Sequence, residues 1–317
     1  MDNFKQLFSS LVRESRVKEC FCVGTECSSS VIKAHSVQNN RILRQIAEGG
    51  YVIQLKPEDV HGKFSIKSKE IGKKVATVST NFCGFHDTKI FLPIESKDYQ
   101  RNNREQEFLF AYRAFAREYH VKREATNLLS NAKKLAKVDQ SYLDLSLMGA
   151  NLTLKQMENE KIWLNDALRK LDFNKIGTCT IEFHGYYQVA ASSAFAVEYD
   201  LRGNRINDFS NPDQDLKFIF LSIFPQGRRT FVLLSFYNKD KKLFSFINNQ
   251  IKKRSISEQK VIVSNLLLSH VENLVLSPKL WNKLLAEQQD VVKQMFLKTV
   301  DSFENHLSNL SDINLFI

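Results

Sequence analysis

Long hydrophobic runs are missing from this sequence of 317 residues. No segment reaches the roughly 20 apolar residues that a transmembrane helix needs, and residues 1–20 lack the basic start and apolar run of a signal peptide. Cysteine is also scarce, because the chain has five, an odd number that does not suit a secreted disulfide scaffold. We therefore expect a cytoplasmic protein that does not enter a membrane.

Glycine and proline are few, at 11 and 5, which argues against long flexible linkers. The hydrophobic fraction of 43% and the charged fraction of 25% are ordinary for a folded globular protein. Disorder and coiled-coil rods are therefore disfavoured. The length favours two domains, and 24 phenylalanines indicate aromatic cores.

Several motifs that bind nucleotides or activate a serine are also missing. The sequence has no phosphate-binding loop of the GxxxxGKS or GxxxxGKT type, no dinucleotide fingerprint and no GxSxG elbow. These absences disfavour kinases, P-loop ATPases, dehydrogenases and α/β-hydrolases.

The chain carries a net charge of +10, from 45 Lys and Arg against 35 Asp and Glu. The excess is spread along the chain, without a basic tail. Such a balance favours a nucleic-acid partner, DNA or RNA, because basic groups neutralise phosphates and release counterions. A general solubility charge would have the same composition, and a protein partner or a homo-oligomer stays open.

Three regions differ in hydrophobic period. Residues 1–98 contain four of the five cysteines, strand-like runs at 51–55 and 74–78, and a short helix expected over 36–48. Residues 99–172 predict a helical hairpin, whose second helix is expected to begin at a capping box of Thr153 and Gln156. Residues 173–317 predict strands and then helices. The expected fold class is α+β: a small zinc-binding module of ββα or treble-clef type, the hairpin, and an antiparallel sheet packed by helices. The strands expected in the third region are 178–183, 194–199, 217–224 and 230–237.

An aromatic stripe marks the first helix of the hairpin, at Phe108, Tyr112, Phe115 and Tyr119. Stripes at helical spacing are usually core, so we expect the neighbouring arginines to form a solvated face. A basic helix lying on nucleic acid is the alternative.

Two pairs of metal-ligand residues lie in the first region, in the segments FCVGTEC and NFCGFHD. Zn²⁺ prefers four thiolate and imidazole ligands in a tetrahedron, often supplied by closely spaced pairs. The predicted ligands of a structural zinc ion are Cys22, Cys27, Cys83 and His86. Cys20 is an alternative to Cys22, while Cys179 is expected to be a core residue. The alternative is that these residues bind no metal and are free buried cysteines with a histidine on the surface.

His35 follows the first pair at the end of an expected strand, and Asp87 follows the second pair. A histidine that is not needed as a zinc ligand can act as a general base for water, and a carboxylate suits Mg²⁺ or Mn²⁺. His35 and Asp87 are therefore the candidate catalytic residues. Alternatively, His35 is a zinc ligand in place of His86 or caps a helix, and Asp87 caps a turn.

A group of lysines in the same region is expected to form a basic loop. Contact with phosphate is the functional interpretation, and a solvated loop is the ordinary one. The candidate nucleic-acid contacts are Lys67, Lys69, Lys73 and Lys74.

These residues together resemble the HNH nuclease finger, a ββα-metal fold. The resemblance implies that Cys22, Cys27, Cys83 and His86 hold structural zinc and that His35 activates water. Asp87 stands where the family has a metal-binding histidine, and Asn81 lies closer to the second pair than the asparagine of the family does.

Longer stretches, such as CVGTECSSSVIKAHSVQNNRILRQIA and FCGFHDTKIFLPIE, are similar to a widespread group of bacterial proteins. That similarity supports the domain plan and implies no particular activity. Defence of bacteria against phage is an association that would suit such a protein.

The function expected from the sequence is a zinc-finger protein that acts on nucleic acid, as a metal-dependent HNH-like endonuclease if it is an enzyme. The alternative is a non-catalytic, zinc-stabilised binding or assembly protein that recognises a partner protein.

Overall fold

The computed structural model describes residues 2–22, 26–28, 30–60, 63–134, 140–301 and 311–317. Its N-terminal half consists of α1 (Asp2–Glu14), β1 (Val31–His35), a π-turn (Asn39–Leu43), α2 (Arg44–Ile46), β2 (Tyr51–Val60), β3 (Lys63–Gly72), β4 (Val78–Cys83), α3 (Gly84–Glu95), α4 (Arg104–Ala132) and α5 (Gln140–Arg169). Its C-terminal half consists of β5 (Ile176–His184), β6 (Val189–Ala196), β7 (Phe218–Gln226), β8 (Arg229–Tyr237), a second π-turn (Ile247–Lys252), α6 (Ile256–His270), β9 (Val275–Leu276), α7 (Pro278–Lys283) and α8 (Ala286–Asp301). The α+β class and the antiparallel sheets expected from the sequence are confirmed.

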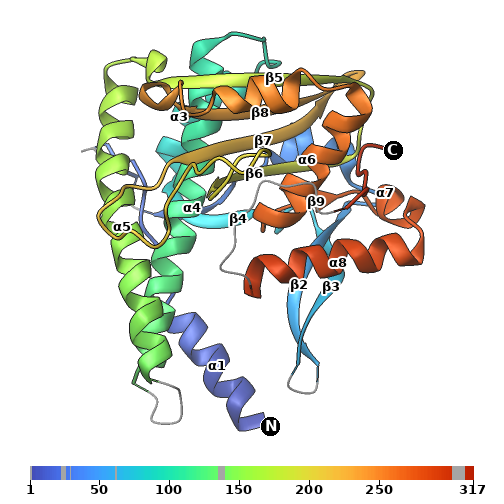
Figure 1. The fold of residues 1–317 in the computed structure, drawn as a ribbon. Helices are drawn as coiled ribbons and strands as arrows, with labels where there is room; N and C mark the ends of the chain where they lie inside the picture. The colour runs from blue at the N-terminus through green and yellow to red at the C-terminus, as the bar shows by residue number, and fades with distance from the viewer. Residues whose placement is uncertain (1, 23–25, 29, 61–62, 135–139, 302–310) are drawn as a thin grey trace.

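The strands form two sheets (Figure 1). A small one pairs β1 with β4, and a seven-stranded one has the order β3-β2-β9-β6-β7-β8-β5. The two residues of β9 join the halves of the chain, because Leu276 pairs with Ile53 of β2 on one side and with Val189 of β6 on the other. The large sheet therefore combines strands from the predicted regions 1–98 and 173–317. The division of the chain into separate domains at these boundaries stays a prediction.

Helices cover both faces of the large sheet. On β7, Ile219, Leu221 and Ile223 belong to the core beneath α6 and α8, whereas Phe220 and Phe224 belong to the core beneath α4. Side chains alternate between the faces of a strand, so a strand buried on both faces has the continuous apolar sequence seen here. The expectation that β7 and β8 are covered on both faces is thus confirmed, and α4 packs against both the large sheet and α5 (Figure 1).

The aromatic stripe of α4 is core, as expected, with Phe108, Tyr112 and Phe115 fully buried. The arginines beside it differ from the expected solvated face, since Arg113 is buried and the side chain of Arg117 is only 13% exposed. Although α4 and α5 are long, no helix in the described ranges is also apolar enough to cross a membrane.

Two element boundaries differ from the sequence-based prediction. Thr153 lies inside α5 and donates to Gly149 O at 3.0 Å, a bond within the helix, so it caps nothing. Residues 73–77 form turns, and the strand expected at 74–78 begins at Val78. Inside a helix, a threonine hydroxyl can instead bond the carbonyl four residues earlier, so the capping pattern at Thr153 does not mark a helix start.

Candidate metal centre

Four side chains of the N-terminal half converge on one point, and each of them offers one possible metal-ligand atom. They are Cys20, Cys27, Cys83 and His86, and their donor atoms all lie within 4.8 Å of one another. Cys20 and Cys27 come from the segment between α1 and β1, Cys83 ends β4, and His86 lies in the first turn of α3. Residues widely separated in sequence thus form a cluster that can bind a metal ion such as zinc.

The geometry of the cluster fits a tetrahedral ion. His86 Nδ1 lies 3.4 Å from Cys20 Sγ, 3.4 Å from Cys27 Sγ and 3.3 Å from Cys83 Sγ. Zinc bonded to sulfur and nitrogen at its usual distances would separate these atoms by about 3.6 Å. Three thiolates and one imidazole also form the soft donor set of a closed structural site.

Backbone pairing brings Cys20 to the cluster. Phe21 N donates to Asn81 O at 2.7 Å and Glu19 N donates to Thr80 O at 3.3 Å, so the segment after α1 runs alongside β4. Phe21 is 2% exposed, and the rings of Tyr112 and Tyr119 contact it edge-on. This buried aromatic contact fixes the position of the neighbouring thiol.

Cys83 caps the N-terminus of α3, where its Sγ accepts the backbone N–H of His86 at 3.5 Å. Burial raises the pKa of the Cys83 thiol, but hydrogen bonds from Ser28, His86 and Cys20 outweigh burial and lower it to about 6. Burial raises the pKa of Cys20 to about 12. Since a metal binds thiolates, binding at neutral pH must release a proton from Cys20.

Cys22, a predicted ligand, is not part of the cluster; Cys20 takes its place. Burial raises the pKa of Cys22 to about 11, and the Cys22 thiol forms a side-chain hydrogen bond with Tyr112. Pair spacing alone favoured Cys22, whereas the pairing of residues 19–21 with β4 selects Cys20. Cys179, which was expected in the core, lies on β5, where it is half-buried and packs against the hydrophobic core.

His35 lies at the other end of the small sheet. It pairs with Val78, while Cys83 pairs with Val31, which is four residues or about 13 Å along the strand. His35 Nδ1 is 3.0 Å from the carbonyl of Ala76, and burial lowers the pKa of the ring. His35 is therefore not a fourth ligand of the cluster, and its Nε2 is the nitrogen left for other chemistry.

Asp87 lies half-buried in the first turn of α3. Burial raises the pKa of its carboxyl, and the charge of Arg113 opposes that rise. Within the described residues, the cysteine and histidine cluster is the only group of three or more potential metal ligands, so neither Asp87 nor His35 belongs to a second one.

The sequence predicted that the candidate lysines share one loop, but the structure places them in two different elements. Lys67 and Lys69 lie on β3, where their Nζ atoms are 2.5 Å and 3.5 Å from the carboxylate of Glu58. Lys73 and Lys74 follow β3 in a turn and have no ion pair with the residues that the structure describes. The second pair is thus the less neutralised.

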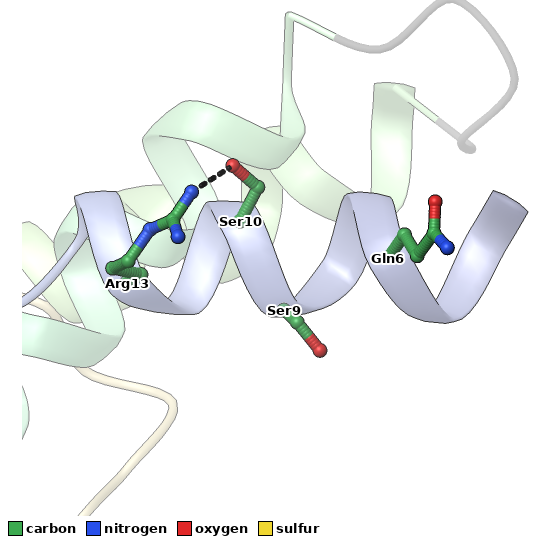
Figure 2. Close-up of a pocket in the computed structure, with 4 residues that line it drawn as sticks. All are labelled: Gln6, Ser9, Ser10 and Arg13. Carbon is green, nitrogen blue, oxygen red and sulfur yellow. Dashed lines mark hydrogen bonds between the residues drawn. The ribbon is translucent and has the colours of Figure 1, made fainter.

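A shallow hollow on α1 offers no comparable chemistry. Figure 2 shows its four lining residues on one helix, with Arg13 donating to Ser10 Oγ at 3.3 Å. Arg13 is the one charged group there and Gln6 and Ser9 complete the lining, so nothing converges on a ligand.

Comparison with known proteins leaves the cluster to be interpreted from its own chemistry. No protein-family model, curated protein or solved structure matches this chain.

Proposed function

We propose that this chain is a zinc-stabilised protein that acts on nucleic acid. The observation that carries the proposal is the order of elements around the cluster: two thiols, β1, β4 with Cys83 at its end, and then a helix whose first turn supplies His86. This is the order of the HNH finger, with the hairpin of β2 and β3 inserted between its strands. The cysteine and histidine donors would hold zinc and fix β4 to the segment after α1.

The charge of the chain supports a polyanionic partner. The net charge is +10, and the turn after β3 adds Lys73 and Lys74 close to the small sheet. Phosphate contacts of this kind act through counterion release and weaken as salt rises. Lys67 and Lys69 would contribute less, because Glu58 already neutralises part of their charge.

A second candidate function, cleavage of the nucleic acid, is favoured by the state of His35. Its Nδ1 faces a carbonyl oxygen, which favours the tautomer with a proton on Nδ1 and a free lone pair on Nε2. The lowered pKa keeps the ring neutral at pH 7. In this proposal Nε2 takes a proton from water, whose oxygen attacks the phosphorus while the phosphodiester oxygen leaves. A Mg²⁺ or Mn²⁺ ion held by Asp87 would supply positive charge for the phosphate.

The test separates binding from cleavage. Binding of labelled single- and double-stranded DNA and RNA is measured over a range of salt, for the wild type, Lys73→Gln/Lys74→Gln and Lys241→Gln/Lys242→Gln. The two variants lose equal charge, and Lys241 and Lys242 are exposed in the C-terminal half. We expect the first variant alone to flatten the salt dependence, by up to about two phosphate contacts. Equal effects of both variants would reject a specific site in the turn.

Cleavage is assayed on plasmid and RNA with Mg²⁺ or Mn²⁺, using wild type, His35→Ala and the exposed-histidine control His184→Ala. We expect His184→Ala to retain activity and His35→Ala to lose at least about a hundredfold, the usual contribution of a general base. Binding without cleavage would leave a non-catalytic zinc protein, and absence of binding would favour recognition of a partner protein.

A further inference from the structure

A polar hollow of about 470 Å³ lies where the segment after α1, the strands β2 and β4, and the helix α4 meet. None of the four cluster residues lines it. Its volume falls within the range of pockets that enclose a whole small molecule. It is therefore a place apart from the metal centre where several polar side chains face one partly open space.

Positive charge dominates the lining. Its five basic side chains are Arg16, Lys18, Lys33, Lys56 and Arg117. The one carboxylate in the lining, Glu124, already accepts the backbone N–H of Val17 at 3.0 Å and lies 3.2 Å from His120 Nε2. Glu118 and Glu272 pair with Arg117 outside the lining. The other basic groups of the lining have no ion pair with the described residues.

Gln54 and Lys56 lie two residues apart on β2 and therefore point to the same side of the strand. Gln54 is 3% exposed, yet its amide forms no hydrogen bond with the described residues. Lys56 is half-buried and equally without a partner there. Neither side chain is engaged by the described residues, so both can contact a molecule that enters the hollow.

Repulsion inside the hollow indicates the charge of the ligand. Burial lowers the pKa of Lys56, and the nearby charge of Arg117 lowers it further. Lys67 and Lys69, which pair with Lys56 and Gln54 across the hairpin, lie on the same face, although Glu58 neutralises part of their charge. An anion relieves this repulsion, because each added negative charge interacts favourably with every cation around it.

We propose that this hollow binds a small phosphorylated molecule about the size of a mononucleotide. Lys56 and Arg117 would bind the phosphate, since both are donors that match its oxygens. The amide of Gln54 and the wall of Val78 and Val121 would contact the remainder of the ligand. The floor residues Gln54, His120 and Asn273 are 3–4% exposed, too deep for the backbone of a polynucleotide that passes over the surface.

The test is calorimetric titration of the full chain, with its metal, using inorganic pyrophosphate, AMP, GMP, CMP and UMP, and a short single-stranded oligonucleotide for comparison. We expect saturable binding of at least one probe with one site per chain. Lys56→Gln should weaken it by about tenfold or more, the effect of losing one charge-assisted hydrogen bond. Lys67→Gln is the matched control, because Lys67 lies directly opposite on β3 but is largely exposed, and it should change the affinity less than about threefold.

Lys56→Gln removes a desolvated charge and is expected to stay folded, which thermal unfolding verifies. Gln54→Ala offers a second, uncharged variant that should weaken the same probe. Three results would overturn the proposal: no saturable binding of any probe to the wild type, equal affinities of wild type and Lys56→Gln, or dependence on Lys56 only for a single-stranded oligonucleotide. The last result would assign the hollow to a polynucleotide.

Discussion

Cys20 and Cys22 are separated by a single residue and have different roles. Cys20 faces the cluster because residues 19–21 pair with β4, whereas Cys22 lies against the buried ring of Tyr112. The sequence predicted the donor types, the number of ligands, and three of the four positions. The fourth depends on a backbone pairing between segments about sixty residues apart, which local spacing does not encode.

The two thiols should respond differently to substitution by serine. We expect Cys22→Ser to retain about one zinc ion per chain and Cys20→Ser to lose it or bind it weakly, because only Cys20 supplies a ligand. Elemental mass spectrometry of protein purified without chelator measures the content. Retention by Cys20→Ser together with loss from Cys22→Ser would contradict the arrangement of the cluster.

Glu160 of α5 makes stability depend on pH. Burial raises the pKa of its carboxyl to about 7, although bonds from Gln156 and Tyr237 favour the ionised form. A raised pKa means that the folded state holds a proton that the unfolded state releases, so stability present below pH 4.5 is lost as pH rises towards 7.

We therefore expect Glu160→Gln to flatten that slope and to stabilise the protein at pH 8 by up to about 3 kcal/mol. Urea unfolding between pH 4.5 and 8 tests this. The exposed control Glu287→Gln should keep the slope of the wild type. An unchanged slope in Glu160→Gln would show that another group titrates.

Among the helices and strands, the sequence predicted those whose position depends on a local pattern of residues. The apolar runs of β7 and β8, the aromatic helix α4 and the serine cap of α7 all follow from neighbours in the chain. Gly227, at φ +61°, also provides the tight turn between β7 and β8. The two-residue strand β9 could not be predicted, since it has no period of its own and exists only because β2 and β6 flank it.

The strand β9 gives a direct test of the sheet order. Val275 is fully buried and pairs with Gln54 on one side and Ala190 on the other. Proline there removes a ladder hydrogen bond in a central strand, so Val275→Pro should destabilise the fold by about 3 kcal/mol or more. The matched control is Ile256→Pro at the first position of α6, which tolerates proline and should change stability by less than about 1 kcal/mol. Thermal unfolding followed by circular dichroism compares them, and equal stability of the two variants would contradict the position of β9.

At the scale of the whole molecule, the cluster connects the segment after α1 to the aromatic side chains of β4 and α4. Phe21, next to Cys20, packs with rings from β4 and α4. Metal removal should therefore lower the unfolding temperature, by about 10 °C if several kcal/mol are lost. Calorimetry before and after 1,10-phenanthroline, with zinc added back, measures the change. An unaltered unfolding temperature in protein shown to have lost its metal would mean that the cluster does not stabilise the fold.

The position of β9 also has a consequence for synthesis on the ribosome. Gln54 emerges more than two hundred residues before Val275, its partner in the sheet, so the edge of β2 waits about 10 to 40 s at usual rates of translation. An open edge can pair with another nascent chain. Lys56 and Pro57 lie on β2 just beyond the two residues that β9 covers, and a charge and a proline are the residues that discourage such pairing. The same lysine that lines the basic hollow would thus protect the unfinished protein from aggregation.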